Sequence, residues 1–69
     1  MKIYLRQTVL KERRRLVTPC ATLAQARAEA AALLRFARND GCEVRRTGPM
    51  KWTARDGLDV EELHVVVRP

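Results

Sequence analysis

The chain has 69 residues, of which 14 are Lys or Arg and 8 are Asp or Glu, so its formal net charge is +6. A chain of this length forms one domain, residues 1–69, and buries only about 60% of its unfolded surface. These limits leave little material for a catalytic cleft, so we expect a non-enzymatic protein that binds on an outer surface.

Apolar and polar residues alternate over residues 2–9, which predicts a half-buried strand whose outward residues are Tyr4, Arg6 and Thr8. Residues 14–19 can return as an antiparallel strand. The connecting residues 10–14 include no Gly, Asn or Asp, so a short helical turn or a long mobile loop is an alternative to a tight hairpin. Arg13, Arg14 and Arg15 of this basic run are expected at the rim of the sheet, and Lys11 lies in the connecting loop.

A helix is predicted over residues 23–39. Thr22 and Gln25 have the spacing of a capping box, and Gly41 supplies a left-handed stop at the other end. Ala, Leu, Arg, Glu and Gln, all good helix formers, fill most of the segment. The face expected to pack on the sheet contains Leu23, Ala26, Ala30, Leu33, Leu34 and Ala37, with Phe36 at its margin.

Three arginines, Arg27, Arg35 and Arg38, fall on one flank of this helix, separated by small alanines. An ordinary solvated flank is one interpretation. The other is a row of guanidinium groups that a phosphate backbone or an acidic groove could approach closely.

Three more strands are predicted after the helix, over residues 42–47, 50–54 and 62–69, with turns at residues 48–49 and 55–59. Alternation again divides each strand into two sets of side chains. The inward set is Cys42, Val44, Met50, Trp52, Ala54, Leu63, Val65 and Val67.

The expected fold class is α+β, with a mainly antiparallel sheet of four to five strands in ββαβββ order and one helix packed on one face. One helix leaves the other face of the sheet exposed. Basic residues interleaved with an aromatic on such a face are typical of nucleic-acid platforms built from strands. The residues expected there are Tyr4, Arg6, Thr8, Arg45, Lys51, Thr53, His64, Val66 and Arg68.

The charge is unevenly distributed along the chain. Residues 1–20 hold six cations and one anion, whereas residues 48–69 hold three cations and four anions. Eleven of the cations are Arg, whose planar guanidinium binds phosphate or carboxylate through two parallel hydrogen bonds. The sequence therefore favours an anionic partner, with a merely solvated surface as the alternative.

The sequence offers little catalytic chemistry. The helix separates Cys20 from Cys42 by about 27 Å, so both are expected to be free thiols. With a single His, His64, the chain lacks the four closely spaced ligands of a zinc site, and its clustered carboxylates belong to a predicted turn. We therefore expect no catalytic residue, no metal and no cofactor. No segment is apolar enough to span a membrane and no signal peptide is evident, so a cytoplasmic protein is expected.

In length and element order, the whole chain resembles small anti-CRISPR proteins of phages and mobile elements. The local likeness is the helix opening Thr22-Leu23-Ala24-Gln25-Ala26-Arg27. The resemblance implies an inhibitor in the host bacterial cytoplasm that binds a type I CRISPR-Cas effector complex and blocks target-DNA engagement or nuclease recruitment.

A direct DNA- or RNA-binding module of phage origin is the alternative, because small arm-binding domains of phage integrases also place a sheet and one helix against a duplex. In either case the expected binding residues are Tyr4, Arg6, Lys11, Arg13, Arg14, Arg15, Arg27, Arg35, Arg38, Arg45 and Lys51. A homodimer formed by pairing of exposed sheet edges is compatible with both functions.

Overall fold

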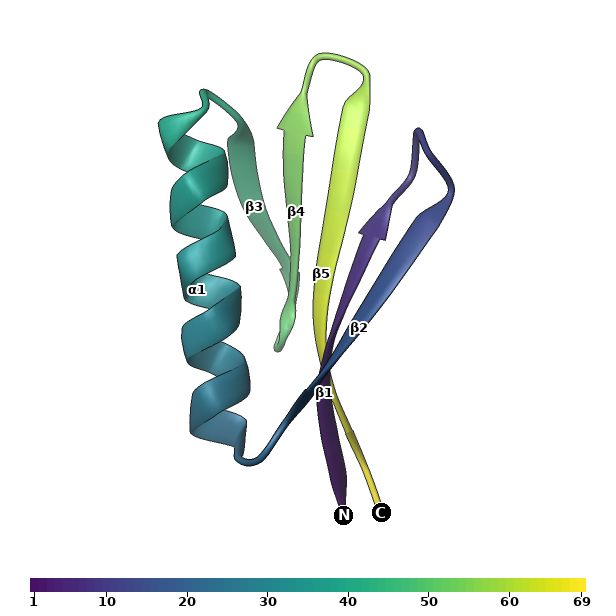
Figure 1. Ribbon diagram of the computed structural model, residues 1–69. Coiled ribbons are helices and arrows are strands. Elements are labelled where there is room, and N and C mark those ends of the chain that lie inside the picture. Colours follow the sequence, from purple (N-terminus) through teal and green to yellow (C-terminus); the bar gives the residue numbers. More distant parts are fainter.

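Two strands precede the single helix and three follow it, in the predicted order (Figure 1). The computed structural model describes all of residues 1–69. The elements are β1 (Lys2–Val9), β2 (Arg14–Cys20), α1 (Leu23–Asn39), β3 (Glu43–Gly48), β4 (Lys51–Asp56) and β5 (Asp59–Arg68). The predicted α+β class is confirmed, with five strands in one sheet.

The five strands form an antiparallel sheet in the order β2-β1-β5-β4-β3. The first hairpin and the last three strands are joined by the pairing of β1 with β5. Lys2 is in register with Arg68 in that pair, so the two chain ends lie side by side at one end of the sheet (Figure 1). The edges of the sheet are β2 and β3.

The basic segment of residues 9–17 forms a hairpin. Val9 is in register with Arg14, which leaves a four-residue turn over residues 10–13. The N–H of Arg13 donates to the carbonyl of Leu10 at 3.2 Å, and Arg13 has a φ of +52°. Arg13 thus adopts the left-handed conformation that Gly normally supplies in such turns, which is why the turn forms without the expected residues.

Both predicted ends of the helix are confirmed. The Thr22 hydroxyl accepts from the N–H of Gln25 at 3.1 Å, and the Gln25 side chain accepts from the N–H of Ala21 at 2.8 Å. At the other end Gly41 has a φ of +87°, and its N–H and that of Cys42 donate back to carbonyls of the last turn. This arrangement is a Schellman motif, which satisfies carbonyls that would otherwise lack partners. The helix is neither long nor apolar enough to cross a membrane.

The core lies between α1 and one face of the sheet. Small residues of the helix allow its backbone to lie close to the strands. The buried core cluster is Ile3, Leu5, Ala26, Ala30, Leu34, Leu63 and Val65, with Leu23, Leu33, Val44, Met50 and Trp52 packed around it. Phe36, placed at the margin of the helix face by the sequence, is 70% exposed and lies outside the core.

The end of β5 departs from the predicted burial. Val67 was predicted to point inward, and it is on the helix side of the sheet but 40% exposed. Val66 was predicted to point outward, and it is only 9% exposed, beside Tyr4 in the register. Figure 1 shows the paired ends of β1 and β5 extending past the start of α1, so the helix does not cover the last part of β5.

Candidate functional site

The face of the sheet opposite α1, here called the open face, has no helix over it (Figure 1). Alternation along each strand and the cross-strand register determine which side chains it displays. Every residue predicted for the outer face lies on it. Its polar and aromatic members, together with Val66, are Lys2, Tyr4, Arg6, Thr8, Arg15, Glu43, Arg45, Thr47, Lys51, Thr53, Arg55, Glu62, His64 and Arg68.

A row of three nitrogen-bearing side chains crosses the middle of the open face. Arg6 on β1 is in register with His64 on β5, which is in register with Lys51 on β4. The Arg6 guanidinium donates to Nδ1 of His64 at 3.0 Å, so the imidazole proton lies on Nε2. Burial first, and then the charges of Arg6 and Lys51, lower the pKa of His64. The imidazole is therefore neutral at pH 7, between two cations.

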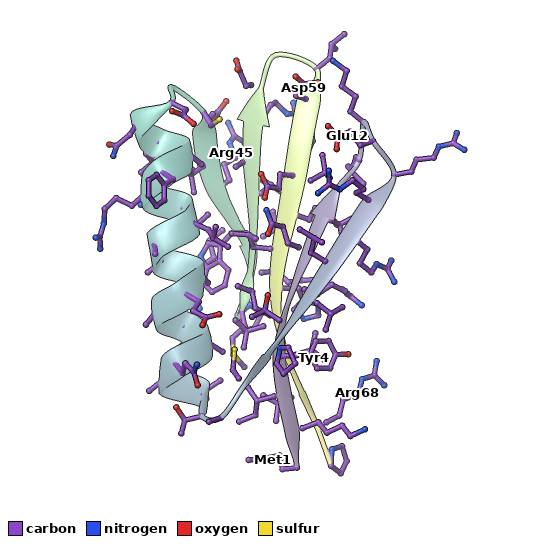
Figure 2. The ribbon with its side chains drawn as sticks, viewed as in Figure 1. Met1, Tyr4, Glu12, Arg45, Asp59 and Arg68 are labelled. Atoms are coloured by element: carbon purple, nitrogen blue, oxygen red, sulfur yellow. The ribbon has the colours of Figure 1, made fainter.

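Tyr4 lies next to this row, toward the chain ends. Tyr4 is in register with Val66, so His64 lies diagonally from Tyr4 on the neighbouring strand. The Cα atoms of such diagonal neighbours are about 7–8 Å apart. The Nε of Arg68 donates to the Tyr4 hydroxyl at 3.2 Å (Figure 2). Both rings are half-buried, and each is held by a hydrogen bond from an arginine. The open face thus presents two oriented planar groups on its central strands.

Few carboxylates neutralise the cations of the open face. Its acids are Glu43 and Glu62, and only Glu43 forms an ion pair, with the Nε of Arg45 at 2.8 Å. That pair is exposed at one edge of the sheet. Apart from Arg45, the cations of the open face, Arg6 and Arg15 among them, form no salt bridge. The open face therefore keeps a net positive charge.

The acidic segment of residues 56–62 lies mostly away from the open face. Asp59 pairs with Lys11 at 3.3 Å, across the top of the two adjacent hairpin turns (Figure 2). Glu61 is on the helix side of β5, where it accepts a hydrogen bond from Gln7. Lys11, predicted as a binding residue, is thus paired within the chain.

Strand alternation divides the basic run of the first hairpin. Arg13 lies in the exposed turn, and Arg14 is on the helix side, where it pairs with the exposed carboxylate of Glu12 at 3.4 Å. Arg15 is opposite Thr8 on the open face. Of the three cations predicted at the rim, only Arg15 lies on the open face, so the basic run does not form one continuous surface.

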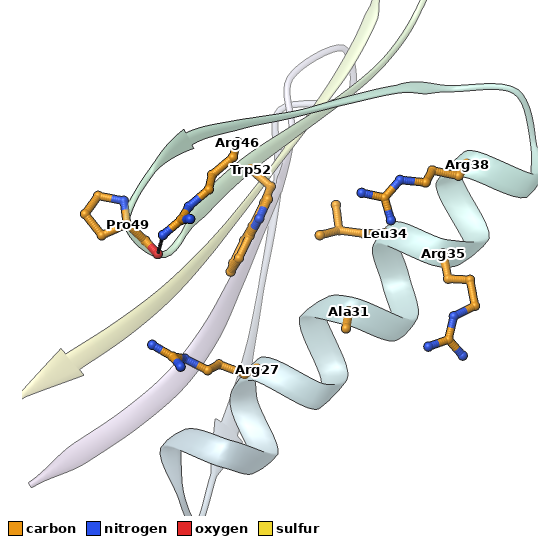
Figure 3. Close-up of a pocket in the computed structure, with 8 residues that line it drawn as sticks. All are labelled: Arg27, Ala31, Leu34, Arg35, Arg38, Arg46, Pro49 and Trp52. Atoms are coloured by element: carbon orange, nitrogen blue, oxygen red, sulfur yellow. Dashed lines mark hydrogen bonds between the residues drawn. The ribbon is translucent and has the colours of Figure 1, made fainter.

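A second basic surface lies between α1 and the β3–β4 turn, and is here called the arginine groove (Figure 3). The three arginines predicted on one helix flank all line it. Its volume is about 440 Å³. The residues that line it are Arg27, Ala31, Leu34, Arg35, Arg38, Arg46, Pro49 and Trp52.

Arg46 is the member of the arginine groove that the sequence reasoning missed. It has the same parity as Val44 and thus the inward side of β3, a signal that was present in the predicted strand. Its Nε donates to the carbonyl of Gly48 at 3.0 Å and its Nη2 to that of Pro49 at 2.9 Å. These bonds fix the guanidinium without neutralising its charge.

Neither thiol is activated. Both cysteines are free, as predicted. Burial and the nearby carboxylate of Glu29 raise the pKa of Cys20, and burial together with Asp56 raises the pKa of Cys42. A thiol with a raised pKa is a poor nucleophile at neutral pH. The structure has no cluster of three or more His, Cys, Asp or Glu side chains that could hold a metal ion.

Comparisons with protein-family models, with curated proteins and with solved structures give no match for this chain. The predicted likeness to anti-CRISPR proteins therefore stays a prediction. The molecule displays two cationic surfaces, one with planar groups on the uncovered face of the sheet and one in a groove.

Proposed function

We propose that this protein binds single-stranded nucleic acid on the open face of its sheet. The observation that supports the proposal most directly is the row Arg6–His64–Lys51 with Tyr4 beside it, on an uncovered face with few acids. Sheets that bind single strands combine planar side chains, on which bases stack, with cations that contact phosphates. Tyr4 and neutral His64 provide the first, and Arg6, Lys51 and Arg15 the second.

The width of the sheet favours a single strand over a duplex. Strands are about 4.8 Å apart, so five of them span roughly 20 Å, and the molecule measures 37 × 22 × 18 Å. The major groove of DNA is only about 12 Å wide and admits a helix or a two-stranded ribbon. A five-stranded face is too wide to enter it, whereas a single strand of nucleic acid can lie across the face with its bases on the rings.

Fluorescence anisotropy with labelled single-stranded DNA and RNA of about 15 nucleotides tests the proposal. We expect binding that weakens as salt is raised, with a slope of about −0.7 in log affinity against log salt for each neutralised phosphate. A duplex of equal length should bind more weakly, because it cannot bring its bases to Tyr4 and His64.

Charge reversal identifies the face that binds. The variant Arg6→Glu/Lys51→Glu should weaken single-strand binding about tenfold or more, because two phosphate contacts are lost and two repulsions gained. The matched control Arg13→Glu/Arg14→Glu changes the net charge equally but lies at the turn and on the helix side, so its loss should be much smaller. Equal losses of affinity in the two variants would show that only the net charge matters, and would overturn the proposal.

The inhibitor of a CRISPR-Cas effector complex is the competing prediction, because the same cations could contact an acidic protein surface. A pull-down from a bacterial lysate, with and without nuclease, distinguishes the two. Loss of the captured material after nuclease treatment supports nucleic-acid binding. Nuclease-resistant capture of an effector complex, together with no binding of free oligonucleotides, would replace the proposal with the inhibitor function.

A further inference from the structure

The arginine groove is a cationic site without internal neutralisation. Four guanidinium groups line it, no carboxylate does, and none of the four forms a salt bridge. In Figure 3 Arg27 and Arg38 extend from the helix toward the strands, while Arg35 points away along the outside of the helix. Arg27, Arg38 and Arg46, of which only Arg46 is held by side-chain hydrogen bonds, therefore face the same space.

The arginine groove adjoins the open face at the β3–β4 turn. A small hollow on the open face includes Arg6, Lys51 and His64, and Trp52 lines both this hollow and the groove. Only the turn that follows Arg46 separates the two sites, where the register of β3 with β4 shifts. A single strand of nucleic acid that crosses the row from Arg6 to Lys51 would leave the sheet at this turn, next to Arg46.

We infer that the arginine groove is the continuation of the single-strand path, and that it binds the phosphates of nucleotides beyond those on the open face. The inference rests on the proposed function. The groove would lengthen the contact surface by the part of the helix between Arg27 and Arg38, which is about 16 Å long at 1.5 Å per residue. The site on the open face then determines short-strand affinity, and the groove adds affinity only for longer strands.

The groove offers charge rather than a stacking surface. The one ring that lines it is that of Trp52, which is half-buried and lies next to Arg46 in Figure 3, whereas four of the eight lining residues are arginines. Arginine forks bind phosphate oxygens through two parallel hydrogen bonds without contacting a base. This chemistry fits the backbone of a strand whose bases lie elsewhere. An acidic protein segment is the competing occupant.

The length of the oligonucleotide tests the inference. Affinities are measured for labelled single strands of about 5 and about 15 nucleotides, which lie near the two ends of the range of site sizes of small single-strand-binding domains. For the groove variant Arg27→Glu/Arg38→Glu we expect about a tenfold loss for the long strand and less than about a twofold loss for the short one. The open-face variant Arg6→Glu/Lys51→Glu should weaken both lengths, and Arg13→Glu/Arg14→Glu is the charge-matched control.

A second groove variant, Arg27→Gln/Arg38→Gln, avoids placing an anion in the last turn of the helix, where it would destabilise α1. Circular dichroism establishes that each variant is folded.

Equal losses of affinity at both lengths, or a loss no larger than in the control, would overturn the inference while leaving the open-face site intact. If the wild type binds neither length, the proposed function itself fails. If a labelled poly-glutamate peptide binds the wild type but not the groove variants, while long-strand affinity is unchanged, the groove belongs to an acidic protein segment and the inference is wrong.

Discussion

The two faces of the sheet are formed by alternate residues of the same strands but differ in composition and in what they contact. Between α1 and the face that it covers, Ile, Leu, Val and Ala side chains pack around Leu34 and Val65, and all of the buried apolar residues except Val66 lie there. The open face has charged and planar side chains at the alternate positions of the same strands. Because neighbouring residues of a strand point to opposite faces, one short chain can separate the residues that stabilise it from those available to a partner.

The largest expected effect is a loss of stability after a substitution in the core under α1. Leu34 is 5% exposed at the centre of the core, and its replacement by Ala should lower the free energy of unfolding by about 2–5 kcal/mol. Leu33 is the matched control, because it is half-buried at the edge of the same cluster. Leu33→Ala should lower the free energy of unfolding by only about 1 kcal/mol. Urea denaturation followed by circular dichroism measures both. A larger loss at Leu33 than at Leu34 would contradict the packing described above.

A smaller effect tests whether the division between faces also governs the basic hairpin. Arg15 lies on the open face and Arg14 on the opposite side. Arg15→Ala should weaken single-strand binding severalfold and reduce the salt slope by about 0.7, whereas Arg14→Ala should do neither. Anisotropy titrations at several salt concentrations measure both quantities. Identical behaviour of the two variants would show that the hairpin acts as a mobile cationic tip.

A third substitution changes stability without altering either face. Arg13 is in a left-handed conformation, so Arg13→Gly should raise the free energy of unfolding by about 0.5–1 kcal/mol. Arg13→Ala removes the same charge but keeps the strain, and should not stabilise the protein. Thermal unfolding curves of the three proteins provide the measurement. Stabilisation by both variants would attribute the effect to charge repulsion instead.

The smallest expected effect is a pH dependence that arises on the open face. The lowered pKa of His64 means that, as the pH falls below the ordinary value of 6.5, the unfolded chain takes up a proton before the folded one does. Stability should therefore decrease as the pH falls from about 6.5 toward the folded-state pKa. The groups that face His64 are Arg6, Lys51 and Glu62. The difference in urea midpoint between the wild type and His64→Gln should shrink at acidic pH, and a constant difference would exclude this linkage.

Local features of the fold could be predicted from the sequence. The helix ends follow from Thr22, Gln25 and Gly41, whose hydrogen bonds involve only near neighbours in the chain. The assignment of Tyr4, Arg6 and the other outward residues to one face follows from strand alternation alone. These predictions needed no knowledge of which strands pair.

Features that depend on distant pairing could not be predicted in the same way. The order β2-β1-β5-β4-β3 is fixed by contacts such as that of Lys2 with Arg68, which lie at opposite ends of the sequence. The Arg6–His64–Lys51 row exists only in that order. The arginine groove likewise depends on where α1 crosses the sheet, so Arg46 was not grouped with the helix arginines. Homodimer formation through the edges β2 and β3 stays a prediction.

The adjacent ends of β1 and β5 have a consequence for how the chain folds. The contact between them closes the whole polypeptide into a loop, and such non-local closure slows folding because its entropy must be lost before the contact stabilises anything. A short glycine-serine linker between Pro69 and Met1, with new ends cut in the turn at residues 56–59, would turn the β5–β1–β2 segment into a continuous meander. In this circular permutant the pairing of β4 with β5 would close the chain instead, so it should keep the same architecture and refold at a rate close to that of the natural connectivity in stopped-flow experiments.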